Sequence, residues 1–100
     1  MNAKFNEIIN QSQLVLVDFY ADWCGPCKMM SPILQETKTA VKDAVKIIKI
    51  NVDQHQDLAA EFMVRGVPTF MLFKEGKMLW RQSGVLSKNQ LVEIINQHKN

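Results

Sequence analysis

The sequence Leu14-Val-Leu-Val-Asp-Phe-Tyr-Ala-Asp-Trp-Cys-Gly-Pro-Cys27 joins an apolar run to the two cysteines of the chain. The run Leu14–Tyr20 is nearly all apolar, which is typical of a strand covered on both faces. A Cys-x-x-Cys motif where a strand passes into a helix is a redox signature. The stretch therefore predicts a buried strand followed by a helix whose first turn carries a reactive dithiol.

A helix N-terminus explains why a thiol at this point is reactive. Its unpaired N–H groups and aligned peptide dipoles favour negative charge, so we expect Cys24 to be a thiolate near neutral pH. The spacing of three residues places Cys27 on the same side of the first turn, close enough to form a disulfide. Pro26 loses no hydrogen bond this early in a helix, and Gly25 leaves the sulfur uncovered for a protein substrate.

Two other interpretations of the cysteine pair are a zinc site and a structural disulfide. A zinc site needs four ligands, and the remaining candidates, His55 and His98, lie in unrelated polar segments. A disulfide across two residues closes so short a loop that it constrains the unfolded chain little. We therefore expect redox chemistry and no metal.

Length and composition indicate one small domain over residues 1–100, since 47% of the residues are hydrophobic. The net charge of +2 comes from interspersed charges without a basic stripe, which argues against nucleic-acid binding. We recognise no signal peptide and no apolar run of the about 18 residues that span a membrane. A dithiol without a secretory signal predicts a cytoplasmic protein.

Hydrophobic periodicity predicts alternating helices and strands. We expect strands at 14–20, 46–52, 69–73 and 78–82, and helices at 5–9, from the cysteines to about 41, at 57–64 and from 87 onward. Strands separated by helices imply parallel pairing, and Glu75-Gly76-Lys77 indicates a final antiparallel hairpin. The predicted class is α/β, with a mixed four-stranded sheet and helices on both faces.

Side chains with an expected packing role lie mainly on the helix that follows the cysteines. Pro32 should kink this helix, because it removes a backbone donor and clashes with the preceding turn. Tyr20 and Trp80 are assigned to packing. The inward positions of the helix are expected to be Met29, Met30, Ile33 and Leu34.

Motifs along most of the chain resemble the thioredoxin family. They are Val17-Asp-Phe-Tyr-Ala-Asp-Trp-Cys-Gly-Pro-Cys-Lys-Met29, Pro32-Ile-Leu34, Lys49-Ile-Asn-Val-Asp53, Arg65-Gly-Val-Pro-Thr69, Phe73-Lys-Glu-Gly76 and Gly84-Val-Leu-Ser-Lys88. The resemblance runs from about Val15 to the C-terminus and implies the thioredoxin fold. Members usually begin with an extra strand, but about four residues precede Phe5, so we expect that strand to be short or absent.

The resemblance also implies roles for two charged residues that interrupt apolar strands. A carboxylate within a strand is costly unless it is partnered or used, although Asp18 at a strand end could instead turn to solvent. In the family, the Asp at this position lies under the second cysteine and accepts its proton through water. Lys49 matches the lysine that faces this Asp, and the alternative is an ordinary solvated lysine.

In the family's cycle, the first cysteine attacks and the second resolves. We expect Cys24, exposed at the helix start, to form a mixed disulfide with a substrate, and Cys27, more buried, to release it. Pro68 can be a plain loop stop, but the resemblance favours a cis Val67–Pro68 bond that exposes backbone for an extended substrate. The expected substrate-binding residues are Trp23, Val52, Gly66, Val67, Pro68, Gly84 and Val85, beside the site-shaping Gly25 and Pro26. Trp23 as plain core is the alternative.

The resulting prediction is a general protein-disulfide reductase that binds no cofactor. The resemblance implies recycling by a flavin-dependent thioredoxin reductase that uses NADPH, disulfide-containing protein substrates, and a monomer without membrane or nucleic-acid partners. An oxidant or isomerase is a second interpretation, disfavoured because oxidising relatives usually carry His in place of Gly25 or Pro26. A binding subunit with incidental redox chemistry is a third, disfavoured because a scaffold needs neither Asp18 nor the cysteine pair.

Overall fold

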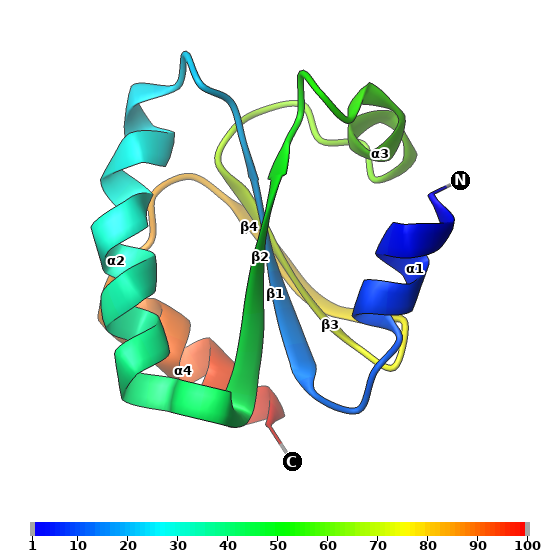
Figure 1. Ribbon diagram of the computed structural model, residues 1–100. Helices are drawn as coiled ribbons and strands as arrows, with labels where there is room; N and C mark the ends of the chain where they lie inside the picture. The colour runs from blue at the N-terminus through cyan, green and yellow to red at the C-terminus, as the bar shows by residue number, and fades with distance from the viewer. Residues whose placement is uncertain (1, 100) are drawn as a thin grey trace.

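The apolar runs form a four-stranded sheet in the computed structural model, which describes residues 2–99 (Figure 1). The strands are β1 (Leu14–Tyr20), β2 (Val45–Asn51), β3 (Thr69–Lys74) and β4 (Lys77–Ser83). Their order is β2-β1-β3-β4, with β1 parallel to β2 and antiparallel to β3, and β3 antiparallel to β4. The mixed sheet that the sequence predicted is confirmed.

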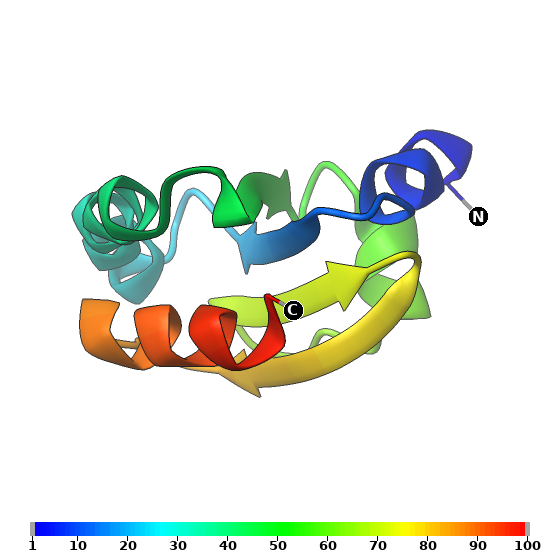
Figure 2. The ribbon, with the colours of Figure 1, turned by 90° about the horizontal axis from the view of Figure 1, so that it is seen from below.

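Helices cover both faces of this sheet (Figures 1 and 2). They are α1 (Ala3–Ile9), α2 (Gly25–Val41), α3 (Gln56–Glu61) and α4 (Lys88–His98). Strand β1 is buried on both faces, and the side chains of its alternate residues pack in two different hydrophobic cores. Leu14 and Leu16 pack in the core that α2 and α4 cover, whereas Val15 and Val17 pack in the core that α1 and α3 cover.

Helix α2 corrects one expectation about inward residues. Met30 and Leu34 are buried as predicted, but Met29 is 59% exposed. The buried positions of α2 are Cys27, Met30, Leu34 and Thr37. They recur every three or four residues, which is the spacing of one helix face. Met29 falls outside this spacing, so its side chain points away from the core.

Helix α3 ends earlier than predicted, at Glu61 rather than near Val64. Met63 has φ of 52°, a left-handed conformation that stops the helix without a glycine. The Val64 N–H bonds to the Ala59 carbonyl at 2.8 Å and closes the last turn. The chain therefore leaves the helix before Gly66.

The sheet has two edge strands, β2 and β4. Among residues 2–99, no strand precedes α1, whose N-cap Asn2 accepts a hydrogen bond from the Phe5 N–H at 2.9 Å. Strand β2 therefore has one neighbour, β1, among the described residues. Within residues 2–99, no helix is long and apolar enough to span a membrane.

Candidate redox-active site

Cys24 and Cys27 form a disulfide where β1 leads into α2. Their Cα atoms are 5.3 Å apart. Cys24 is the N-cap of α2, and its Sγ accepts a hydrogen bond from the Cys27 N–H at 3.1 Å. A thiolate at this position would receive the same N–H group and the positive end of the helix dipole. The site therefore stabilises negative charge on Cys24.

The two residues between the cysteines shape the approach to the sulfurs. Pro26 lies in the first turn of α2, where its missing N–H has no helical partner to lose. A Cβ on Gly25 would meet no atom within 4 Å. The space over Gly25 is therefore open to an approaching partner.

The expected difference in exposure between the cysteines is wrong in this oxidised form. Both residues are 4% exposed, because they pack with Ala21 against the partly buried side chains of Tyr20, Val52 and Val67. The difference lies in their neighbours instead. Cys24 Sγ lies 3.7 Å from the Val67 carbonyl oxygen.

Cys27 borders a different feature, a cavity of about 330 Å³ beside α2. Ser31 and Lys49 line the same cavity, together with Tyr20, Ala21, Asp22 and Lys28. One cysteine therefore adjoins the Val67 carbonyl, and the other borders the cavity that Ser31 and Lys49 line. This arrangement permits different roles for the two thiols.

Asp18 is fully buried in β1, with 0% exposure. Neither carboxyl oxygen has a hydrogen-bond partner among the described residues. Burial raises the pKa of Asp18 to about 6, and the opposing attraction of Lys49 is smaller. The alternative of a solvent-facing carboxylate is excluded.

Lys49 is the register partner of Asp18 on β2, so both side chains leave the same face of the sheet. The Lys49 ammonium nevertheless lies in solvent and donates to the Ser31 hydroxyl at 3.1 Å. It also lies 5.7 Å from the centroid of the Tyr20 ring. Lys49 is thus a solvated lysine that still acts electrostatically on Asp18.

The loop that enters β3 lies against the disulfide. Its Val67–Pro68 peptide bond is cis, and Pro68 is buried. The Thr69 hydroxyl donates to the Gly66 carbonyl at 2.6 Å, and the Gly84 N–H donates to the Pro68 carbonyl at 2.9 Å. These bonds hold the Val67 carbonyl beside Cys24.

The expected binding residues surround this loop with different exposures. Trp23 is 71% exposed and Val85 44% exposed, so Trp23 is not a core residue. Gly66 and Gly84 are also exposed, while Val52 and Val67 are partly buried. A shallow cavity of about 100 Å³ is lined by Trp23, Val52, Val64, Arg65, Gly66 and Val67.

Sequence reasoning missed the partner of Trp23. The indole N–H donates to Asp53 Oδ2 at 2.9 Å. The Asn51 side chain accepts from the Asp53 N–H at 2.9 Å and so fixes the turn that carries this carboxylate. The available signal was topological: both residues follow parallel neighbouring strands, whose carboxyl ends share one edge of the sheet.

The histidines are not placed as metal ligands. His98 Nδ1 contacts the Ile94 carbonyl at 2.9 Å, and His55 lines a cavity next to α1. Across residues 2–99, no group of three or more His, Cys, Asp or Glu side chains is placed to hold a metal ion.

Comparison with known proteins identifies the family. The thioredoxin family model matches residues 1–97. Thioredoxin of Haemophilus influenzae is 45% identical over 98 residues, covering 97% of this chain and 92% of that protein. Chloroplastic thioredoxin Y2 of Arabidopsis thaliana is 46% identical over 93 residues, covering 92% of this chain and 56% of that protein.

A solved structure agrees with the sequence comparisons. A thioredoxin mutant from Halobacterium salinarum superimposes with a TM-score of 0.88 at 34% identity, covering 100% of this chain and 87% of that one. The disulfide at the N-terminus of α2 and the loop beside it thus belong to a fold that is known to exchange disulfides. The chain belongs to the thioredoxin family and is a protein-disulfide oxidoreductase that works by reversible dithiol–disulfide exchange through Cys24 and Cys27.

Proposed function

We propose that Cys24 is the attacking thiol and Cys27 the resolving thiol. The observation that carries this assignment is the N-cap position of the Cys24 sulfur, which accepts the Cys27 N–H at 3.1 Å. The same N–H and the helix dipole favour the thiolate of Cys24 over that of Cys27. Cys24 therefore carries more negative charge at neutral pH and reacts first.

The reaction proceeds in two exchanges. The Cys24 thiolate attacks one sulfur of a substrate disulfide, forms a mixed disulfide and releases the other substrate sulfur, which takes a proton. The Cys27 thiolate then attacks Cys24 Sγ and releases the second substrate thiol. Two electrons pass to the substrate, and the Cys24–Cys27 disulfide is left in the protein.

Asp18 accepts the Cys27 proton in the second exchange. Its side chain projects to the sheet face that α2 covers, and α2 carries Cys27. A pKa of about 6 leaves it ionised at neutral pH and close enough to neutrality to return the proton. A water molecule relays the proton, and Lys49 favours the ionised form of Asp18 by Coulomb attraction.

Substrates bind across the loop at Val67 and Pro68. The Val67 carbonyl beside Cys24 can pair with an extended substrate segment, as in strand addition. Exposed apolar and backbone groups around it offer a docking surface. This surface comprises the exposed Trp23, Gly66, Gly84 and Val85 and the partly buried Val52 and Val67, over the buried Pro68 and next to Gly25 and Pro26.

We place this cycle in the cytoplasm, where the protein carries electrons as a monomer and binds no cofactor itself. A flavin-dependent thioredoxin reductase that uses NADPH restores the dithiol. A reducing compartment suits a disulfide that forms only transiently. The bacterial thioredoxin among the relatives supports this setting.

Trapping of mixed disulfides tests the assignment. Cys27→Ser should accumulate covalent complexes with a disulfide-bonded protein such as insulin, because the resolving thiol is missing. Cys24→Ser should accumulate none and should have no insulin-reducing activity. Comparable complexes from Cys24→Ser would reverse the roles, and full activity of the double serine variant in a cellular assay would favour a scaffold.

A further inference from the structure

Among residues 2–99, strand β2 has a neighbouring strand on one side only, so its other edge carries backbone groups without a strand partner. Successive residues of a strand direct N–H and C=O to opposite sides. The Val52 N–H bonds to the Tyr20 carbonyl of β1 at 2.9 Å, so alternate residues Ile48 and Ile50 also face β1. Ile47 and Lys49 therefore direct their N–H and C=O groups to the side where the described chain has no strand.

A cavity of about 370 Å³ flanks this edge on the face that α2 covers. Leu34 of α2 and Ile47 of β2 give it an apolar part, and Lys38 and Lys49 border it. The Lys38 ammonium also donates to the Val45 carbonyl, at the start of the same edge. The cavity is thus continuous with the unpaired backbone.

A second cavity, of about 200 Å³, flanks the edge on the opposite face. Phe5 and Ile8 of α1 and Ile50 of β2 give it an apolar part, and Lys4 borders it. An added strand sends successive side chains to opposite faces of a sheet. A strand placed beside β2 would therefore fill the two cavities alternately while pairing with Ile47 and Lys49.

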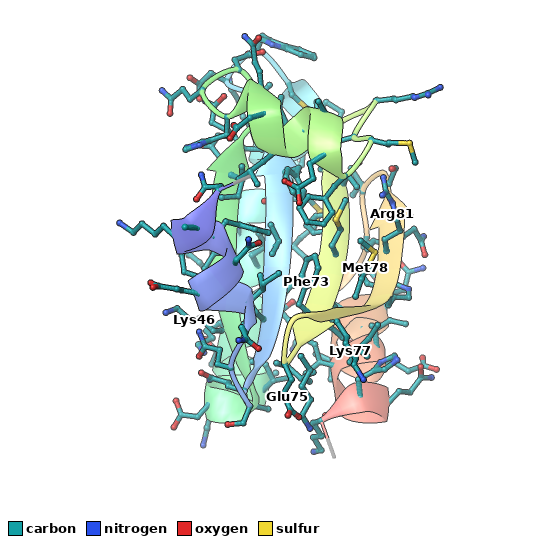
Figure 3. The ribbon with its side chains drawn as sticks, turned by 90° about the vertical axis from the view of Figure 1, so that its right-hand side faces the viewer. Lys46, Phe73, Glu75, Lys77, Met78 and Arg81 are labelled. Atoms are coloured by element: carbon teal, nitrogen blue, oxygen red, sulfur yellow. A yellow bond between two sulfur atoms is a disulfide. The ribbon has the colours of Figure 1, made fainter. Side chains whose placement is uncertain are left out.

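The positive charge around this edge favours an acidic binding partner. Lys38 and Lys49 border one cavity and Lys4 the other, and Lys46 projects from β2 on the α1 side (Figure 3). Neither cavity is lined by an Asp or Glu of residues 2–99. Pairing of two β2 strands from two copies of the chain would bring Lys46 and Lys49 close to lysines of the other copy. The repulsion between these like charges disfavours such a dimer.

We propose that the free edge of β2 is a second docking site, which binds an extended acidic segment of a partner protein by strand addition. Apolar side chains of the segment occupy the two cavities, and its carboxylates lie beside the lysines. The site is distinct from the surface around Trp23 and Val67. Ser31 and Lys49 border both this site and the cavity at Cys27, so a bound segment lies next to the redox centre.

The probe is a synthetic peptide, Asp-Val-Val-Asp-Ile-Ile-Glu, blocked at both ends and titrated into the ¹⁵N-labelled full chain. It places both apolar and acidic side chains on each face of an added strand. The Ile47 and Lys49 amides should shift and exchange with solvent more slowly, whereas the Lys-Val-Val-Lys-Ile-Ile-Lys peptide should not bind. Two N-methylated forms of the peptide, each methylated on one of the two alternating sets of backbone nitrogens, should differ in binding. Only the form whose methyl groups lie on the edge that faces β2 should lose binding.

Charge reversal on the protein supplies the matched test. The Lys4→Glu/Lys46→Glu variant should bind the acidic peptide at least several-fold more weakly and gain binding of the basic peptide. Lys77→Glu, on the β4 edge in Figure 3, should bind as the wild type does. Insulin reduction should be unchanged in both variants, since none of these lysines touches the thiols. Shifts confined to Trp23 and Val67, equal binding of both peptides, or dimerisation through β2 in sedimentation would overturn the proposal.

Discussion

Asp18 and Lys49 are direct partners in the parallel register of β1 and β2, yet their charged groups do not form a hydrogen bond. The Asp18 oxygens are buried without a partner among residues 2–99, whereas the Lys49 ammonium reaches the Ser31 hydroxyl at 3.1 Å. Desolvation therefore dominates the pKa of Asp18 and raises it from 3.8 to about 6. Replacement of Asp18 should therefore change both the stability of the fold and the proposed transfer of the Cys27 proton.

The first prediction concerns stability as a function of pH. Between pH 3.8 and about 6, the folded protein keeps the Asp18 proton and the unfolded chain loses it. Stability from this group is fully present below the unfolded pKa and is lost as pH rises through the folded pKa. The loss is about 3 kcal/mol, since one pKa unit corresponds to about 1.4 kcal/mol.

Urea melts of the wild type and Asp18→Asn across this range isolate the effect. The difference in unfolding free energy between the two proteins should change with pH up to about 6 and then level off. Glu36→Gln, which alters an exposed acid on α2, is the control. A difference that stays constant with pH would show that Asp18 titrates normally in the folded protein.

The second prediction separates stability from activity at pH 7. Asp18→Asn removes a buried charge and should stabilise the protein by roughly 1–3 kcal/mol, less than full desolvation because the amide also lacks partners. The amide cannot accept the Cys27 proton, so resolution of the mixed disulfide should slow while the first attack by Cys24 stays unchanged. Stopped-flow kinetics with a fluorescent disulfide peptide resolves the two steps.

A less stable Asp18→Asn protein that resolves as fast as the wild type would make Asp18 a structural residue. Slowing of both steps equally would instead indicate a distorted site. The Glu36→Gln control should match the wild type in stability and in both rates.

The third prediction assigns the role of Lys49. Because its charge lowers the pKa of Asp18, Lys49→Gln should raise that pKa above about 6. The pH profile of mixed-disulfide resolution should move upward in parallel. Carboxyl ¹³C NMR measures the pKa directly, and Lys46→Gln, on the other face of β2, should leave it in place. An unmoved pKa in Lys49→Gln would reduce Lys49 to a surface charge.

The sequence predicted the cysteine pair and the burial of Asp18 because each rests on local rules. Cysteine spacing and a helix start specify the first, and a charge inside an apolar strand marks the second. Met29 was assigned wrongly because two adjacent methionines leave the inward one undetermined by composition. The end of α3 was missed because Met63 adopts a left-handed conformation that glycine usually takes.

Contacts between distant segments were the other part that sequence patterns did not reveal. Trp23 and Asp53 are 30 residues apart, and their contact depends on β1 and β2 ending at the same edge. The equal burial of the two cysteines likewise arises from packing against Tyr20, Val52 and Val67. Such contacts follow from the assembled sheet and not from any one segment.

The fourth prediction tests the contact between Trp23 and Asp53. The indole is 71% exposed and is held by its hydrogen bond to Asp53 at 2.9 Å. Asp53→Ala should free the side chain, raise KM for protein disulfides several-fold and leave kcat nearly unchanged, because a docking group is lost and the thiols are untouched. A small disulfide such as oxidised glutathione, which needs no docking surface, should react at the wild-type rate.

Fluorescence anisotropy in a Trp80→Phe background reports Trp23 alone and should fall in Asp53→Ala. Asp57→Ala, which removes an exposed carboxylate on α3, is the matched control and should change neither anisotropy nor KM. Asp53→Ala should lose about 1 kcal/mol of unfolding free energy, as expected for one exposed hydrogen bond. If oxidised glutathione and protein disulfides slow equally, Asp53 acts on the thiols and the contact does not position Trp23 for docking.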